Sequence, residues 1–149
     1  PRRAFAEKLI ESCGEKGSVV VYYQPFESGR NSELAKDFPD LAKGLRAINR
    51  RMVDIYEPFQ QRMLYDPAQN GSASLKVVLP TYTDISYEGM AIGNGEQALN
   101  EYKAFAAGYN TDPEDLERLW RALDEYCEKD TYAMVELINV LYEKADYDV

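Results

Sequence analysis

The segment 126–130, with the sequence Tyr-Cys-Glu-Lys-Asp, contains the residues best suited to chemistry in this chain. Its tyrosine and its aspartate are four positions apart in a stretch predicted to be helical, so their side chains share one helix face. A phenol that orients a water molecule, beside a carboxylate that holds a divalent cation, is a hydrolytic pairing. Tyr126 and Asp130 are therefore candidate catalytic residues. The alternative is a core tyrosine beside a solvent-facing aspartate.

The chain of 149 residues contains no histidine. This excludes Ser-His and Cys-His nucleophilic sites, His-Glu-x-x-His zinc sites and any histidine general base. Catalysis would have to use carboxylates, tyrosines, lysines or arginines. Carboxylates suit hard cations such as Mg²⁺ or Mn²⁺.

The formal net charge of −9 argues against a simple nucleic-acid coat protein, because phosphate binding usually requires a basic surface. An acidic nuclease stays open, since bound metal ions neutralise nearby carboxylates. Solubility alone is the other explanation of the charge. No apolar run is long enough to span a bilayer and no secretory signal is present, so we expect a cytoplasmic protein with no membrane partner. Cys13 and Cys127 are predicted to be buried or idle reduced thiols, and a disulfide is the alternative.

Hydrophobic periodicity predicts a single α/β domain over residues 1–149 that is rich in helix. Strands are predicted at residues 18–23 and 52–56. The continuous apolar run of the first strand suggests burial on both faces. Helices are predicted at about 2–13, 27–37, 39–50, 58–64, 75–79 (stopped by Pro80), 95–107 and 112–141, the last with or without a bend.

Two further carboxylates follow the predicted strands, where α/β sheets place their sites. Glu27 lies four residues after the strand at 18–23 and opens a helix, and Asp54 lies at the end of the strand at 52–56. Each also has a structural explanation. Glu27 would favour a helix N-terminus, and Asp54 could cap the helix that follows it.

Other side chains could support such a site. Arg30 lies one helical turn beyond Glu27 and could pair with it or with a substrate, and Lys76 could reach a phosphate. Trp120 and Tyr132 occur at helical spacing and are predicted to pack in the core rather than to stack on bases.

The order of these features resembles that of the DnaQ-like 3′–5′ exonucleases. The segment 23–27 after a strand is similar to their second motif, and Tyr126 with Asp130 is similar to the third motif of the tyrosine subclass. The resemblance implies a ribonuclease H-like fold and action on nucleic acid. It also implies Mg²⁺ or Mn²⁺ held by Glu27 and Asp130, with Tyr126 orienting the attacking water. The chain departs from the motif at Tyr23 and Glu27, where asparagine and aspartate are usual.

A second resemblance runs from residue 20 to residue 135. Its motifs are Phe-Glu-x-x-Arg at 26–30, Phe-Pro-Asp-Leu at 38–41, Ser-x-Ser-Leu-Lys at 72–76, Ser-Tyr-Glu-Gly at 86–89 and Tyr-Cys-x-x-Asp-Thr at 126–131. By these motifs the chain is similar to an uncharacterised bacterial family, domain of unknown function 2779. Its members resemble the C-terminal part of longer proteins, some with a nuclease region upstream, which is the implied partner in the same polypeptide. No activity is established for the family.

DnaQ-like enzymes carry an Asp-x-Glu motif on their first strand, whereas the sequence Asp-Leu-Glu at 115–117 falls inside a predicted helix. We therefore expect a C-terminal fragment that lacks the N-terminal strands and is inactive as a nuclease. Strand edges without neighbours could then pair two copies into a homodimer. The alternative function is a non-catalytic interaction or scaffold module of a larger nucleic-acid-processing protein.

Overall fold

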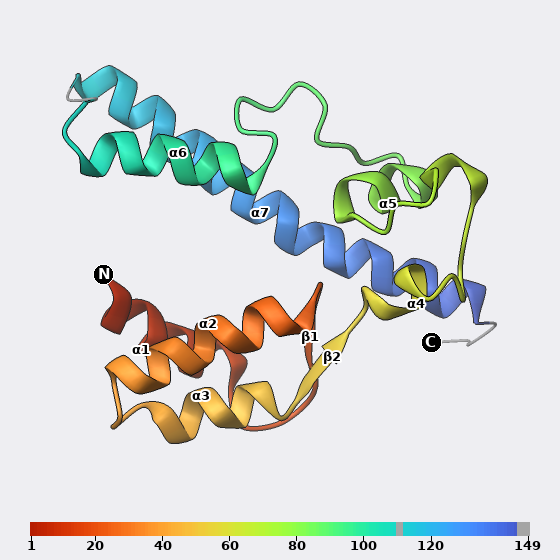
Figure 1. The fold of residues 1–149 in the computed structure, drawn as a ribbon, viewed down its shortest axis with the longest axis horizontal. Coiled ribbons are helices and arrows are strands. Elements are labelled where there is room, and N and C mark those ends of the chain that lie inside the picture. Colours follow the sequence, from red (N-terminus) through yellow and green to blue (C-terminus); the bar gives the residue numbers. More distant parts are fainter. Residues whose placement is uncertain (110–111, 146–149) are drawn as a thin grey trace. The chain divides into compact units, whose positions relative to one another are not determined.

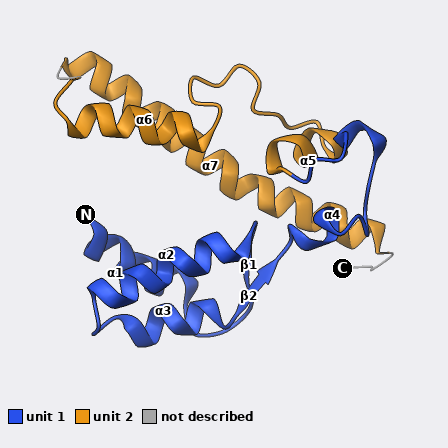
Figure 2. Cartoon of the chain, in the orientation of Figure 1, with its two compact units in different colours: residues 1–73 blue, residues 74–149 orange. Residues whose placement is uncertain are grey.

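The computed structural model describes residues 1–109 and 112–145 (Figure 1). The chain forms two compact units, Pro1–Ala73 (unit 1) and Ser74–Val149 (unit 2), coloured separately in Figure 2. The single domain expected over residues 1–149 stays a prediction.

Unit 1 is built on three helices that pack on one another: α1 (Arg2–Cys13), α2 (Gln24–Asp37) and α3 (Ala42–Asn49). Its apolar core consists of Ala6, Leu34, Ala35, Ala42 and Leu45, with Leu9, Ile10, Phe38 and Leu41 packed against it. The sequence correctly predicted all three helices. Helix α2 begins three residues before its predicted start, because Pro25 fits the first turn of a helix, where no backbone N–H is needed.

A short parallel sheet joins strand β1 (Val19–Val21) to strand β2 (Met52–Asp54), with Val20 opposite Val53. Helices α2 and α3 lie between the two strands in the chain. A four-residue helix, α4 (Glu57–Gln60), and a 3₁₀ turn (Pro67–Gln69) complete the unit.

Burial of the first strand on both faces was a wrong prediction, because only Val21 of its three residues is fully buried. The described residues form no sheet other than this two-stranded one. In so small a sheet, fewer neighbouring elements cover the faces of a strand than in a larger sheet. The ribonuclease H-like fold and the homodimer through strand edges both stay predictions.

Arg51 ties the end of α1 to the loop that enters β1. Its guanidinium donates hydrogen bonds to the carbonyl oxygens of Cys13 (3.2 Å), Gly14 (2.7 Å), Lys16 (2.8 Å) and Gly17 (2.9 Å). These carbonyls lie at and beyond a helix C-terminus, where a cation is favoured.

Unit 2 consists of α5 (Leu75–Tyr82), α6 (Gly95–Ala106) and α7 (Pro113–Lys144), and both shorter helices pack on α7. The carboxylate of Asp112 caps α7 by accepting hydrogen bonds from the backbone N–H groups of Glu114 and Asp115. Helix α7 runs as one helix of 32 residues. Helix α5 continues past Pro80 to Tyr82, contrary to prediction, since a proline near a helix end removes only one backbone hydrogen bond.

Gly44 allows α1 and α3 to approach closely within unit 1. A Cβ atom added at Gly44 would lie 2.8 Å from Cδ1 of Ile10 and 3.1 Å from both Cγ atoms of that side chain. All three distances are shorter than ordinary van der Waals contact, so the isoleucine side chain would have to move inside a packed core.

We expect Gly44→Ala to destabilise the protein by about 1–2 kcal/mol, because overpacking outweighs the better helix propensity of alanine. The matched control is Gly29→Ala in α2, where an added Cβ meets nothing within 4 Å and should stabilise by about 0.5–1 kcal/mol. Chemical denaturation of both variants measures the difference. Equal stability changes would show that the α1–α3 contact is not tight.

Candidate functional site

The residues predicted to form the site are divided between the two units. Unit 1 contains Glu27, Arg30 and Asp54, and unit 2 contains Lys76, Tyr126 and Asp130. Glu27 and Asp130 belong to different units, so a metal site that both residues share stays a prediction.

Within unit 2, four side chains meet in a polar cluster: Lys76 from α5, Tyr87 from the segment between α5 and α6, and Tyr126 and Asp130 from α7. The hydroxyl of Tyr87 donates a hydrogen bond to Oδ1 of Asp130 at 2.5 Å. Nζ of Lys76 donates to the hydroxyl oxygen of Tyr126 at 3.3 Å. The structure therefore brings three of the predicted site residues together, and it adds Tyr87.

The Lys76 ammonium lies near two aromatic rings. Nζ is 5.3 Å from the ring centroid of Tyr87 and 5.1 Å from that of Tyr126, and the two centroids are 6.2 Å apart. Both distances fall within the range at which a ring face attracts a cation. The cluster, which we call the lysine–tyrosine cluster, thus combines hydrogen bonds with cation–π contacts.

Burial raises the pKa of the Tyr87 hydroxyl well above its ordinary value, and the neighbouring Asp130 carboxylate raises it further. The same two causes, in the same order, raise the pKa of Tyr126. Both phenols therefore keep their protons at neutral pH. They serve as hydrogen-bond donors that hold or orient an oxygen atom, and not as general bases.

Asp130 fits the role of a single ligand for a hard cation, because a carboxylate is the ligand type that Mg²⁺ and Mn²⁺ prefer. One of its oxygens already accepts from Tyr87. Among residues 1–109 and 112–145, no group of three or more Asp, Glu or Cys side chains is arranged to hold a metal ion. The lysine–tyrosine cluster contributes one carboxylate, that of Asp130.

Asp54 has a structural role, and the supporting catalytic role predicted for it stays a prediction. Its Oδ1 accepts from the backbone N–H groups of Tyr23 (2.9 Å) and Tyr56 (3.0 Å), and its Oδ2 accepts from that of Gln24 (2.7 Å). The carboxylate therefore holds the start of α2, rather than only the turn that follows it. Tyr23, the residue before α2, has left-handed backbone angles (φ 73°, ψ 70°), which a tyrosine rarely adopts.

Glu27 and Arg30 lie in the first two turns of α2. Glu27 is half-buried, and Arg30 is exposed. The guanidinium of Arg30 pairs with Glu33 at 2.6 Å and lies 5.3 Å from the ring centroid of Phe26. The structure thus gives Arg30 a partner other than those considered from the sequence, and its contact with a substrate stays a prediction.

Several side chains differ from their predicted roles. Trp120 and Tyr132 are 41% and 50% exposed, so the prediction that they pack in the core is wrong. Cys13 and Cys127 are free thiols, the first half-buried and the second exposed. Sequence reasoning missed the role of Tyr87 because its segment has no periodicity. The Ser-Tyr-Glu-Gly motif around it was the available signal.

Comparison with known proteins identifies only the first half of the chain. A family model described as "Domain of unknown function (DUF2779)" matches residues 1–74, which coincide closely with unit 1. The chain matches no curated protein and no solved structure. Tyr126 and Asp130 lie outside the matched region, so the family resemblance beyond residue 74 stays a prediction. Within the described residues, every helix is too short or too polar to span a membrane.

We expect Asp54→Ala to destabilise the protein by about 2 kcal/mol, because three backbone N–H groups lose a charged acceptor. Asp54→Asn keeps one acceptor oxygen and should cost about half as much. Denaturation in urea measures both. If Asp54 were a metal ligand with no structural role, the stability of both variants would equal that of the unmodified chain.

The raised pKa of Tyr87 predicts a pH dependence of stability. The unfolded chain ionises this phenol near pH 10, below the pKa in the folded state, so the free energy of unfolding falls as the pH rises above 10. Tyr87→Phe lacks this titration, and its stability should fall less steeply between pH 9 and pH 11. The control is Tyr109→Phe, because Tyr109 is 87% exposed. Parallel stability curves for Tyr87→Phe and the unmodified chain would contradict the prediction.

Proposed function

We propose that this chain is part of a metal-dependent nuclease that resembles the 3′–5′ exonucleases and acts on nucleic acid. In this proposal α7 supplies Asp130 as one ligand of a Mg²⁺ or Mn²⁺ ion, with Tyr126 beside it. The observation that supports it is that Tyr126 and Asp130 meet in one polar cluster with Lys76. A ribonuclease H-like fold, Glu27 as a second ligand and a cytoplasmic location belong to the same proposal.

We also propose that these 149 residues do not cleave nucleic acid by themselves. Hydrolysis between two metal ions needs several carboxylates that clamp the attacking and leaving oxygens. Both oxygens of Asp54 accept backbone hydrogen bonds, and Asp130 shares one oxygen with Tyr87. The remaining ligands would come from the upstream nuclease region that the family resemblance implies, or from a second copy of the chain.

Titration with Mn²⁺ tests the ligand role of Asp130, because a paramagnetic ion broadens the NMR signals of nearby amides. We expect weak binding that broadens the amide signals of residues 126–130 and disappears in Asp130→Asn. Asp124→Asn, on the opposite face of α7, is the control and should leave this broadening unchanged. Broadening at residues 126–130 that persists in Asp130→Asn would refute the assignment.

A cleavage assay tests the second part of the proposal. With Mn²⁺ and end-labelled single-stranded DNA or RNA, we expect the chain to cleave no faster than its Asp130→Asn variant. Robust cleavage that Asp130→Asn abolishes would show that the chain is a complete nuclease and that its remaining ligands lie within these residues.

A second candidate is an interaction module within a larger nucleic-acid-processing protein, and the distribution of charge favours it. Eleven of the 17 Lys and Arg residues lie in residues 1–73, whereas sixteen of the 26 Asp and Glu residues lie in residues 74–149. The acidic half repels phosphate groups and attracts basic surfaces. A protein partner therefore suits unit 2 better than a nucleic acid does, unless metal ions are bound.

A further inference from the structure

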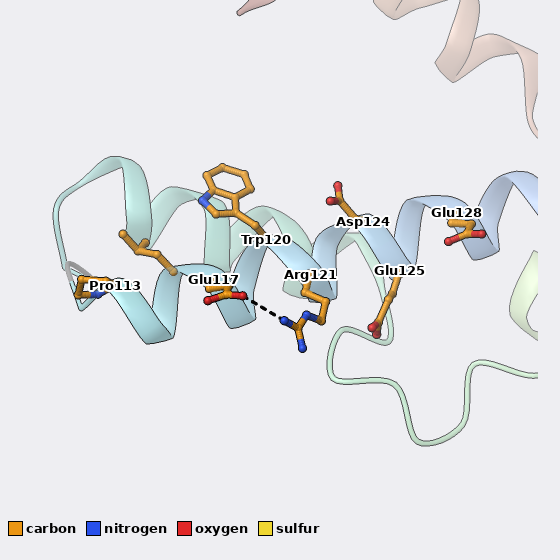
Figure 3. A pocket seen from close by; sticks show the side chains of 8 residues that line it. Pro113, Glu117, Trp120, Arg121, Asp124, Glu125 and Glu128 are labelled. Atoms are coloured by element: carbon orange, nitrogen blue, oxygen red, sulfur yellow. Dashed lines mark hydrogen bonds and ion pairs between the residues drawn. The ribbon is translucent and has the colours of Figure 1, made fainter.

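One face of α7 forms a shallow hollow of about 680 Å³ (Figure 3). We call it the acidic groove. Its lining comes entirely from α7 and includes Pro113, Leu116, Trp120, Asp124, Glu125 and Glu128. An apolar end around Trp120 is thus followed, along one helix, by three carboxylates.

The apolar end of the acidic groove has a fixed geometry. The ring of Trp120 packs edge-to-face on Phe105 of α6, with centroids 5.1 Å apart and planes at 76°, and it also lies near Tyr102 at 6.3 Å. These contacts orient the indole and still leave Trp120 41% exposed. An oriented, exposed indole offers a face on which a cation or an apolar side chain can pack.

The acidic end carries negative charge that the described residues do not neutralise. Arg121 is the basic residue of the groove, and it pairs with Glu117 at 3.1 Å (Figure 3). Within residues 1–109 and 112–145, none of Asp124, Glu125 and Glu128 forms an ion pair. Three neighbouring carboxylates without counter-ions repel one another, and a basic partner would relieve that repulsion.

The groove continues into a second hollow between α7 and the segment before α6. This hollow shares Glu125 and Glu128 with the acidic groove and adds Glu88 and Tyr132. Its basic residue, Lys129, donates to the carbonyl oxygen of Ser86 at 2.9 Å. From Pro113 to Tyr132 the combined surface is about 28 Å long, enough for an extended segment of roughly eight residues.

The acidic groove and the lysine–tyrosine cluster lie on opposite faces of α7. Trp120, Asp124 and Glu128 recur every fourth residue and form one stripe. Tyr126 and Asp130 each follow a member of that stripe by two positions, which is a rotation of about 200° around the helix axis. A ligand in the groove would therefore not occupy the site proposed for the metal ion.

We propose that the acidic groove binds a basic protein segment, in which arginine or lysine side chains alternate with apolar anchors. The apolar anchors pack at the end formed by Leu116 and Trp120, and the cations pair with the carboxylates from Asp124 to Glu128. Bidentate pairing favours arginine. The proposal rests on the second candidate function and names its partner class, and it is independent of the nuclease proposal.

Trp120 provides the measurement, because it is the one tryptophan of the chain. We would titrate the full chain, without metal ions, with a synthetic twelve-residue peptide of alternating leucine and arginine, and with a matched peptide of leucine and glutamate. We expect a saturable change of Trp120 fluorescence with the basic peptide alone. Its dissociation constant should rise about tenfold between 50 and 300 mM salt, since the pairs are partly exposed.

Two variants with equal net charge locate the binding site. The groove variant combines Asp124→Asn, Glu125→Gln and Glu128→Gln, and the control combines Glu15→Gln, Glu101→Gln and Glu143→Gln. We expect the groove variant to weaken peptide binding at least about tenfold and the control less than about twofold. Circular dichroism verifies that both variants are folded.

Each other outcome overturns the groove as the binding site. An equal loss in the two variants indicates general charge attraction. Undiminished binding by both variants places the partner elsewhere and leaves the interaction module standing, whereas absence of any peptide binding refutes the basic segment as partner. A single-stranded oligonucleotide that competes with the peptide for Trp120 would assign the surface to nucleic acid. Asp130→Asn should bind the peptide normally, so failure of the nuclease proposal does not affect this test.

Discussion

Unit 1 depends on one carboxylate, because Asp54 connects the end of β2 to the start of α2. Its two oxygens accept hydrogen bonds from three backbone N–H groups, those of Tyr23, Gln24 and Tyr56. This holds Tyr23 in a left-handed conformation that a tyrosine adopts only when its surroundings stabilise it. The turn that presents Phe26 and Glu27 therefore depends on the three hydrogen bonds that Asp54 accepts.

Unit 2 is organised around side-chain contacts rather than a sheet. Lys76, Tyr87, Tyr126 and Asp130 come from three separate segments and meet in hydrogen bonds and ring contacts. Contact of the ammonium with two rings, together with phenols that donate to a carboxylate, offsets the cost of placing charge in a partly buried position. The cluster therefore both anchors α5 and the segment after it to α7 and sets the protonation state of the tyrosines.

Much of the fold could be predicted from sequence, because apolar residues at helical spacing and capping residues indicate where a helix lies. Helix α1, both strands and the beginning of α7 were all predicted correctly. The sequence placed Tyr126 and Asp130 on one helix face by their spacing and named Lys76 as a candidate, and the structure brings these three side chains into one cluster. Tyr87 and the role of Asp54 depend on contacts across 43 and about 30 residues, which no periodicity encodes. Trp120 was misassigned because an aromatic residue on an exposed face has the same spacing as one in a core.

The two faces of α7 impose different electrostatic requirements on one helix. On one face, Asp130 accepts a hydrogen bond from Tyr87 and lies beside Tyr126, so its carboxylate has polar partners within unit 2. On the other face, Asp124, Glu125 and Glu128 form no ion pair within the described residues, and Arg121 already pairs with Glu117. A helix needs only one buried face for its stability, so the second face is free to carry charge that costs folding energy. Repulsion of this kind persists in a folded protein when solvent or a partner offsets it. The oriented indole of Trp120 at the end of the same face favours a partner over solvent alone.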